Sequence, residues 1–353
     1  PWRGRITCSP APGFAGSPDK TATAGAQVNA FFNEYDAMVQ HYANLCASAG
    51  GVDGFVVGPE LRGLTWSRDA LGSYPAVTRL RQLASYAKSA LGASCDVTYA
   101  CNWSEWTHST ADGYWFHLDP FWADSNVDVC GVDNYLPQSD WRDGTQHADY
   151  DGVNGPVTIF DPSYQKSQIE GGEYYDYFYA NDSDRTNQIR TPITDGIGKE
   201  WIHRRKDFRN WWSNQHYNRP GWVEDASPTA WVPYSKPIWF TEFGVPAVDK
   251  ASNQPNVSYD PKSSESFFPY FSSGSRDDFI QRVSVEATLE YWRLNSPSNG
   301  GLTMVENRNM FVWTWDARPF PDYPVRDEVW SDGSQWFKGH CWTGGVSRVP
   351  LAR

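Results

Sequence analysis

The chain has 353 residues and a formal net charge of −12, since 42 acidic side chains outnumber 30 Lys and Arg. This charge argues against nucleic acid or an anionic membrane surface as a partner, because both require a basic footprint. A hydrophobic content of 40% is ample for a core, and no run of 18 apolar residues predicts a membrane span. The 19 Trp, 19 Tyr and 18 Phe could pack a core or stack on sugars, which composition does not separate.

Helix-like and strand-like segments alternate through the first 135 residues. Residues 4–8 are interpreted as a strand, and apolar residues then recur at helical spacing over 19–49. The following segments predict a strand at 52–58, a helix at 76–91, a strand at 96–101, a short helix at 116–123 and a strand at 127–135. This order favours a parallel sheet with helical crossovers.

Residues 138–235 interrupt the alternation, because they are polar, aromatic and rich in turn residues. Only 199–215 reads as a helix there. We therefore predict an insertion within one domain, and a run of this kind inside a compact domain is usually functional. Regular elements return with a strand at 237–244, a helix that starts at a capping box of Ser275 and Asp278, and a last strand at 310–315.

The fold class that this order predicts is α/β, and we interpret it as a (β/α)8 TIM barrel. The chain would hold strands three to eight, with the long insertion after strand six. The domain over 1–353 is therefore expected to be N-terminally incomplete. Five strand ends carry polar or aromatic residues, namely Glu60, Asn102, Asp133, Glu242 and Trp315. In a (β/α)8 barrel the carboxyl ends of the strands carry the chemistry.

Glu60 and Glu242 are the candidate catalytic pair, because each lies at the end of an apolar strand. Glycoside hydrolysis uses two carboxyl groups that flank the scissile bond. A separation of roughly 5–5.5 Å favours retention of configuration and roughly 6.5–9.5 Å favours inversion. The alternative for either residue is a solvated or ion-paired Glu at a strand end.

Four segments resemble strands four to seven of retaining TIM-barrel glycosidases: GFVVGPEL at 54–61, VTYACNW at 97–103, VDVCGVDNYLP at 127–137 and PIWFTEFGVP at 237–246. They are similar to the β-mannanase family with a GTEL, TYAANW and FTEIG pattern, and FVWTWDARP at 311–319 resembles strand eight. The resemblance implies that Glu60 is the acid/base and Glu242 the nucleophile. Pro59 departs from the pattern, because many of these enzymes have there an Asn that contacts the sugar 2-hydroxyl.

Further motifs resemble the TIM-barrel-like domain of gene transfer agent and phage tail proteins: RGRITCSPAP at 3–12, PAVDKASNQPNV at 246–257, DPKSSES at 260–266 and WDARPFP at 315–321. Such a domain belongs to the baseplate hub, or tail-tip protein, of particles that alphaproteobacteria release. The resemblance covers almost the whole chain. It implies a place in the tail of a phage-like particle and other tail proteins as partners.

Several residues near the strand ends are candidates for substrate binding. Asn102 and Trp103 could supply a polar contact and a stacking platform, or else a cap and a core indole. Asp133 and Tyr135 could hydrogen-bond the nucleophile and keep it ionised, or else cap a turn and pack.

Four tryptophans are further candidates. Trp313 and Trp315 alternate with their neighbours and so face one side of a strand, where one could be a sugar floor. Trp66 and Trp106 follow strands in loops and could extend the cleft. Core packing is the alternative for all four.

No metal or cofactor is expected, because the seven His form neither an HExxH motif nor a tight cluster. No two of the six Cys are spaced CxxC, so buried free thiols are the interpretation. Three functions remain open. The domain could hydrolyse a β-linked glycan of the cell envelope to aid DNA delivery, bind a surface polysaccharide without cutting it, or serve as a structural tail hub.

Overall fold

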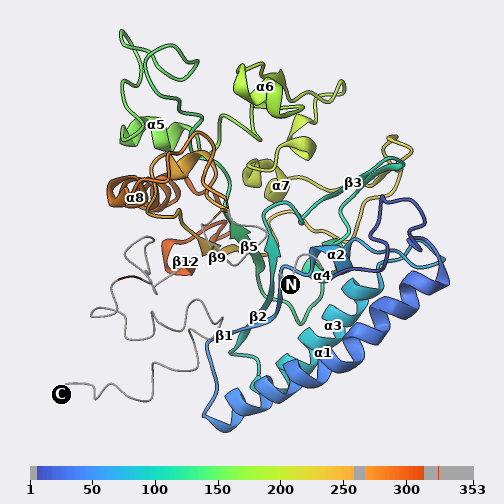
Figure 1. The fold of residues 1–353 in the computed structure, drawn as a ribbon. Helices are drawn as coiled ribbons and strands as arrows, with labels where there is room; N and C mark the ends of the chain where they lie inside the picture. The colour runs from blue at the N-terminus through green and yellow to red at the C-terminus, as the bar shows by residue number, and fades with distance from the viewer. Residues whose placement is uncertain (1–5, 258–266, 314–324, 326–353) are drawn as a thin grey trace. The chain divides into compact units, whose positions relative to one another are not determined.

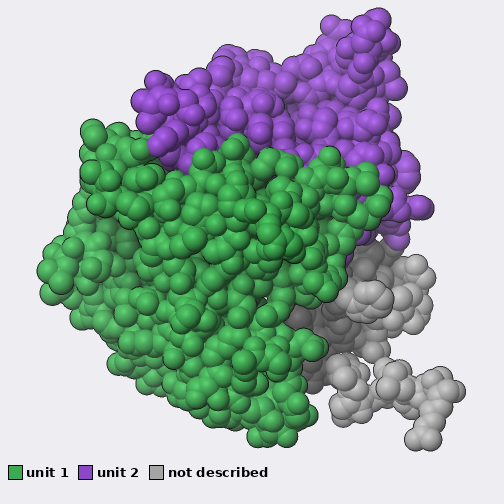
Figure 2. Space-filling view, turned by 180° about the vertical axis from the view of Figure 1, so that it is seen from behind, with its two compact units in different colours: residues 1–134, 207–243, 292–311 green, residues 135–206, 244–291, 312–353 purple. Residues whose placement is uncertain are grey.

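The computed structural model describes residues 6–257, 267–313 and 325. The chain divides into two compact units, which Figure 2 colours green and purple. Unit 1 comprises residues 1–134, 207–243 and 292–311, and unit 2 comprises residues 135–206, 244–291 and 312–353. The segment 138–235, predicted as one insertion, is therefore shared between the units, with the division after Lys206.

A five-stranded sheet organises unit 1, with the strand order β1-β2-β5-β9-β12 (Figure 1). Its strands are β1 Gly54–Pro59, β2 Asp96–Asn102, β5 Cys130–Asn134, β9 Ile238–Phe243 and β12 Met310–Val312. The pairs β1–β2, β2–β5 and β5–β9 are parallel. Every residue of β2 after Asp96 is buried, as expected for a parallel strand covered on both faces. The first four strands predicted after residue 50 are confirmed with small shifts at their ends, and the fifth is confirmed over 310–312, while residues 314 and 315 lie outside the described residues.

Two long helices lie side by side next to β1 and β2 (Figure 1). They are α1 Ala22–Ser48 and α3 Pro75–Leu91, and both confirm the predicted helices. Pro75 occupies the first turn of α3, where its missing N–H costs nothing. Gly92 ends α3 with φ at 88°, a conformation that favours glycine. Spacing of apolar residues was therefore sufficient to locate this layer.

The remaining elements are short. In unit 1 they are α2 Arg62–Thr65, β3 His108–Thr110, β4 Gly113–Trp115, α4 Asp119–Trp122, α7 Phe208–Ser213, β8 Arg219–Pro220, β10 Ser298–Asn299, β11 Leu302–Thr303 and η4 Asn307–Asn309. In unit 2 they are α5 Pro162–Ser167, β6 Tyr177–Phe178, α6 Asp182–Thr186, β7 Thr191–Pro192, η2 Glu200–His203 and η3 Ala251–Asn253. Helix α8, Asp278–Asn295, begins in unit 2 and ends in unit 1.

The predicted strand at 4–8 is not found in its described part, because residues 6–8 form no strand. Residues 4 and 5 lie outside the described residues. The Thr7 hydroxyl donates to the carbonyl oxygen of Gly63 at 2.9 Å. A Cβ at Gly63 would lie 2.4 Å from the carbonyl oxygen of Ile6, so this approach requires glycine. The segment is thus held beside α2 by individual contacts and not by the repeated backbone hydrogen bonds of a β-strand.

The helix predicted over 199–215 is wrong as a single helix. The structure has a 3-10 turn, η2, and then the separate helix α7. The Asp207 carboxylate accepts a hydrogen bond from the N–H of Asn210 at 3.0 Å and so starts α7 anew. Just before it, the buried Lys206 amine donates to two backbone carbonyl oxygens at 2.7 Å each. These contacts override the helical spacing of the apolar residues.

The predicted capping box of Ser275 and Asp278 is also wrong. The cap of α8 is Asp277, whose carboxylate accepts hydrogen bonds from the N–H groups of Phe279 and Ile280 at 3.0 Å each. An Asp before the first turn satisfies these donors as well as Ser does, so residue type did not decide between the two positions.

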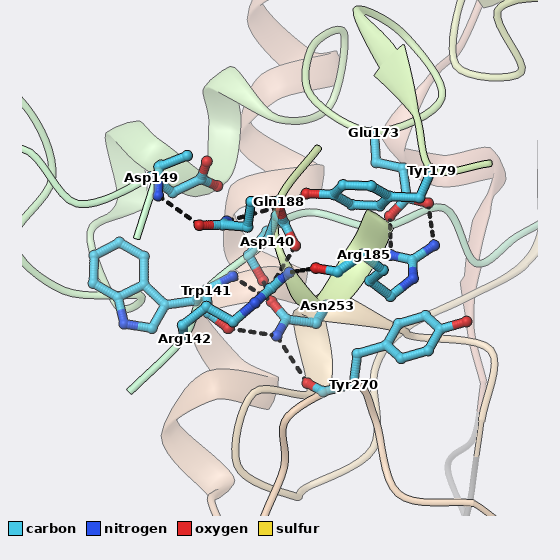
Figure 3. Close-up of polar contacts among 12 residues, drawn as sticks. Asp140, Trp141, Arg142, Asp149, Glu173, Tyr179, Arg185, Gln188, Asn253 and Tyr270 are labelled. Carbon is cyan, nitrogen blue, oxygen red and sulfur yellow. Dashed lines mark hydrogen bonds and ion pairs between the residues drawn. The ribbon is translucent and has the colours of Figure 1, made fainter. Parts of the chain in front are cut away.

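Unit 2 has its own apolar cluster. Its buried members are Trp141, Ile159, Tyr164, Val245, Ala251 and Ile280. Above this cluster Asp140 is the hub of a polar network (Figure 3). Its carboxylate accepts hydrogen bonds from Arg142 at 2.5 Å, Arg190 at 2.8 Å, Tyr179 at 2.5 Å and Gln188 at 3.1 Å. A buried carboxylate is stable only with partners of this kind.

A second buried ion pair lies beside that hub. Arg185 donates two hydrogen bonds to the carboxylate of Glu173, at 2.5 and 2.7 Å (Figure 3). Its guanidinium also lies 4.7 Å from the ring centre of Tyr179 and 4.0 Å from that of Tyr270. One ring of the aromatic-rich segment 138–235, that of Tyr179, therefore serves here as a cation–π partner beside Tyr270.

The described cysteines are all free, as predicted. Four of them are buried, namely Cys8, Cys95, Cys101 and Cys130, while Cys46 is half-buried. Cys341 lies outside the described residues. Within the described ranges, none of the helices has the length and hydropathy needed to span a bilayer.

Candidate active site

Four of the predicted site residues meet at the carboxyl edge of the sheet in unit 1. Asn102 at the end of β2 is the register partner of Asp133 in β5, and Asp133 is the partner of Glu242 in β9. Glu60 follows Pro59, the last residue of β1, which pairs with Ala100. Because neighbouring strands are about 4.8 Å apart, partners in register lie side by side. The structure thus places two of the strand ends directly against Asp133.

Glu60 has an unusual backbone, with φ at 41° in the left-handed region. Such a conformation costs a residue other than glycine about 1–3 kcal/mol and persists where surrounding contacts fix it. The N–H of Glu60 donates to the carbonyl oxygen of Ala100 at 2.7 Å. Its side chain is only 5% exposed, and its Oε1 accepts a hydrogen bond from Nδ2 of Asn102 at 2.8 Å. Both ends of the residue are therefore held by β2.

The orientation of the Asn102 amide follows from its other contacts. Its Oδ1 accepts hydrogen bonds from the N–H of Ser104 at 2.9 Å and from the Ser104 hydroxyl at 2.6 Å. The NH2 group must then be the side that faces Glu60, because only the oxygen can accept. Asn102 thus presents a fixed donor to the candidate acid/base.

Glu105 is a functional candidate that the sequence did not single out. It is fully buried, and its Oε1 accepts hydrogen bonds from the hydroxyls of Thr65 at 2.6 Å and Tyr99 at 2.7 Å. Its Oε2 accepts the N–H of Asn102 at 3.0 Å. The Tyr99 hydroxyl in turn accepts the N–H of Leu61 at 2.5 Å. One carboxylate therefore ties the end of β2 to the residue that follows Glu60.

Burial raises the pKa of Glu105 to about 7, although the hydrogen bonds from Thr65 and Tyr99 act to lower it. The only sequence signal was its place in a short loop, three residues after Asn102 and between two tryptophans. That signal is weak, because one of the three donors, the Thr65 hydroxyl, lies 40 residues away in the chain.

Glu105→Gln is expected to lower the free energy of unfolding by about 1–3 kcal/mol, because one buried donor must lose its partner. The amide either turns its NH2 toward the N–H of Asn102 or toward the two hydroxyls. Urea unfolding followed by fluorescence measures the change. Glu34→Gln on the exposed side of α1 is the matched control, with an expected change within about 0.5 kcal/mol. Equal effects of both substitutions would contradict the assigned role of Glu105.

Glu60, Asp133 and Glu242 form a row of carboxyl groups at this edge of the sheet. Asp133 is the most buried of the three, with no exposed surface. Its Oδ1 accepts the Thr241 hydroxyl at 2.7 Å, and no donor among the described residues reaches Oδ2. The register of β5 and β9 shifts between Val132 and Asp133, so that Thr241 is skipped and its hydroxyl can turn to Asp133. Burial, together with the charges of Glu242 and Glu60, raises the pKa of Asp133 to about 9.

The three tryptophan candidates of unit 1 differ in how far they are buried. Trp66 is half-buried and stacks on His108 with 4.8 Å between ring centres. Trp106 is 3% exposed and packs on Phe208 at 4.5 Å, which fits its core alternative. Trp103 is half-buried at the end of β2.

Two further candidates, Tyr135 and Trp313, belong to unit 2, and Trp313 is 58% exposed. Trp315 lies outside the described residues. Within the described part of the chain, no three His, Cys, Asp or Glu side chains are arranged to hold a metal ion.

A comparison with protein-family models matches most of the chain. The family described as the GTA TIM-barrel-like domain matches residues 33–324. No curated protein matches the chain. The family match spans every strand of the sheet together with Glu60, Asn102, Asp133 and Glu242, and it confirms the resemblance to the TIM-barrel-like domain of gene transfer agents.

Proposed function

The chain belongs to the GTA TIM-barrel-like domain family, and from this premise we propose that it is a retaining glycoside hydrolase of a phage-like particle. Its substrate would be a β-linked glycan of the cell envelope or surface, cut to aid DNA delivery. The proposal extends the family assignment to an activity, which fold by itself never carries. Other proteins of the particle tail would be its partners.

The observation that carries the proposal is the placement of two glutamates around one buried acid, Asp133. Glu242 is the register partner of Asp133, and Glu60 accepts a hydrogen bond from Asn102, which is the register partner of Asp133 on its other side. The two glutamates come from β9 and from the end of β1, on either side of β2 and β5. Two carboxyl groups at the carboxyl edge of a TIM-barrel-like sheet are the minimum that glycoside hydrolysis requires.

The proposed reaction has two steps. Glu60 donates a proton to the glycosidic oxygen while the Glu242 carboxylate attacks the anomeric carbon, which breaks the glycosidic bond and forms a glycosyl ester. Glu60 then takes a proton from water, the water oxygen bonds to the anomeric carbon, and the ester bond to Glu242 breaks. One water is consumed for each bond cleaved, and both glutamates return to their first states.

The contacts of Glu60 suit such a role. The Asn102 amide donates to Oε1 at 2.8 Å and so fixes one of the two carboxyl oxygens of Glu60. The strained backbone of Glu60 and the Glu105 network fix the position of this carboxyl before substrate arrives. Preorganised groups of this kind need no rearrangement during the reaction.

Release of new reducing ends tests the proposal. The full chain is incubated with alphaproteobacterial sacculi, with purified surface polysaccharide and with a panel of β-mannans, beside Glu242→Gln and the surface control Glu34→Gln. We expect release by the parent chain and by Glu34→Gln, and none by Glu242→Gln. No release from any of these glycans by chain shown to be folded by circular dichroism would contradict the proposed activity.

A further inference from the structure

We propose that Asp133 positions the catalytic pair by keeping its proton at neutral pH and donating it through Oδ2 to the carboxylate of Glu242. The catalytic consequence rests on the proposed function, whereas the place of the proton does not. Asp133 would thus act as a neutral hydrogen-bond donor and not as a third negative charge in the row.

The register brings the two residues together. Asp133 and Glu242 are partners on adjacent parallel strands, with no residue between them. Partners in register project their side chains to the same face of a sheet. The nearest acidic neighbour of Asp133 across the β5–β9 pair is therefore the proposed nucleophile.

A shortage of donors around Asp133 favours its neutral form. An ionised carboxylate offers about four sites for hydrogen bonds. Asp133 has no exposed surface, receives one hydrogen bond from Thr241 at Oδ1, and receives none at Oδ2 from the described residues. Glu105 is equally buried but accepts three hydrogen bonds. Of these two buried acids, Asp133 is the one whose charge would have a single hydrogen-bond donor.

The acidic groups around Asp133 also favour its neutral form. They are Glu242 on β9, Glu60 after β1, and Glu105 and the Cys101 thiol at the end of β2. No cation is among the groups with the largest effects on Asp133. Acids this close cannot all ionise, and burial with these charges raises the pKa of Asp133 to about 9. The proton that the row retains is therefore expected on Asp133.

A proton on Oδ2 has a direct consequence for the reaction. A hydrogen bond donated to a carboxylate favours its ionised form, which is the form that attacks the anomeric carbon. Above the pH at which Asp133 ionises, Glu242 would lose this donor and gain a negative neighbour. The alternative is an ionised Asp133 that accepts a substrate hydroxyl.

A carboxyl titration of the full chain decides where the proton lies. Carboxyl carbons of Asp and Glu are labelled with 13C and followed by NMR from pH 4 to 10, and Asp133→Asn and Glu242→Gln assign the two resonances. We expect the Asp133 resonance to keep its protonated position to above pH 8. An Asp133 midpoint below pH 6 would overturn the proposal.

Two variants test the donation to Glu242. An Asn at 133 can still donate a hydrogen bond, whereas an Ala cannot. The midpoint of Glu242 should be similar in parent and Asp133→Asn, and higher by about one pH unit, a tenfold change in acidity, in Asp133→Ala. Equal midpoints in the two variants would contradict donation.

The pH dependence of protein stability also tests where the proton lies, without an Ala variant and without a measurement of activity. The pKa of Asp133 in the folded chain, about 9, lies above its ordinary value of 3.8. Its contribution to stability is therefore complete below about pH 3.8 and is lost as the pH rises toward 9. The urea midpoint of the parent should fall relative to that of Asp133→Asn over this range. Parallel curves would overturn the proposal.

Rates of glycan hydrolysis distinguish the proposed hydrolase function from the proposed role of Asp133. Asp133→Asn should keep kcat within about tenfold of the parent and lose the alkaline fall of activity near pH 9. A loss of about a thousandfold in Asp133→Asn would support the ionised alternative instead. A chain without hydrolase activity would contradict the proposed function, while the titration would still place the proton.

Discussion

Glu60→Ala and Glu242→Ala are each expected to abolish most hydrolysis of a β-linked glycan. Added azide should restore cleavage of the glycan by both variants, and the glycosyl azides that the two variants form should have opposite anomeric configurations. Loss of general acid–base catalysis costs about 10²- to 10⁴-fold in rate. Loss of the nucleophile leaves no route to the glycosyl ester. Rates with and without azide, and the anomer of each glycosyl azide by NMR, are the measurements.

The products follow from where azide can attack. In Glu60→Ala the ester with Glu242 still forms, so azide replaces water and gives the β-azide. In Glu242→Ala azide occupies the place of the missing carboxylate and gives the α-azide. Substrates with a good leaving group should lose less rate in Glu60→Ala, since they need little protonation. The same anomer from both variants would contradict the assigned roles.

The parent chain gives an independent check on this mechanism. The first sugar that it releases should have the β configuration, because two inversions at the anomeric carbon restore the starting one. An α product would mean that Glu60 and Glu242 are far enough apart to admit water between them, at roughly 6.5–9.5 Å. The chain would then remain a glycosidase, but Glu242 would be a base and not a nucleophile.

Asp140→Ala is expected to lower the free energy of unfolding of unit 2 by about 3–5 kcal/mol, because it leaves Arg142 and Arg190 with one buried anion fewer. Asp140 has a side chain that is 4% exposed and accepts hydrogen bonds from five neighbouring side chains (Figure 3). Urea unfolding of the variant and the parent measures the difference.

A matched control separates a buried network from an exposed ion pair. Arg282 and Glu286 pair on the surface of α8 with side chains 70% and 60% exposed. Arg282→Ala should therefore change the free energy of unfolding by no more than about 0.5 kcal/mol. If both substitutions had similar effects, Asp140 would not be the hub that its contacts describe.

Acid should weaken the same network. Burial alone would raise the pKa of Asp140, but the hydrogen bond from Tyr179 and the charge of Arg142 more than offset it and lower the pKa below its ordinary value. This contribution to stability is present above about pH 3.8 and is lost as the pH falls through the lowered value. The difference between parent and Asp140→Ala should therefore shrink below pH 4.

The regular elements were predictable because apolar spacing records which side of a segment is buried. α1, α3 and the strands β1, β2, β5 and β9 follow from this spacing within a few residues. The positions of Glu60 and Glu242 at strand ends follow from the same reasoning, since parallel strands present their carboxyl ends at one edge.

Contacts between distant segments were not predictable in this way. The cap at Asp277 and the break at Lys206 each depend on hydrogen bonds that several residue types could make. The burial of individual aromatic residues was likewise not predictable from the sequence. Trp106 is buried and Trp313 is exposed, although both were candidates for substrate binding.

By itself, then, the sequence determined the order of the main sheet strands and of the two long helices α1 and α3, the family, and two glutamates at the ends of strands, because these depend on local spacing and on motifs. Only the tertiary structure decided which groups surround each carboxyl. Glu105 receives donors from Thr65 and Tyr99, whereas Asp133 is enclosed with a single donor. Burial and hydrogen bonding set the protonation of an acid, and both arise from neighbours that are close in space and far apart in the chain.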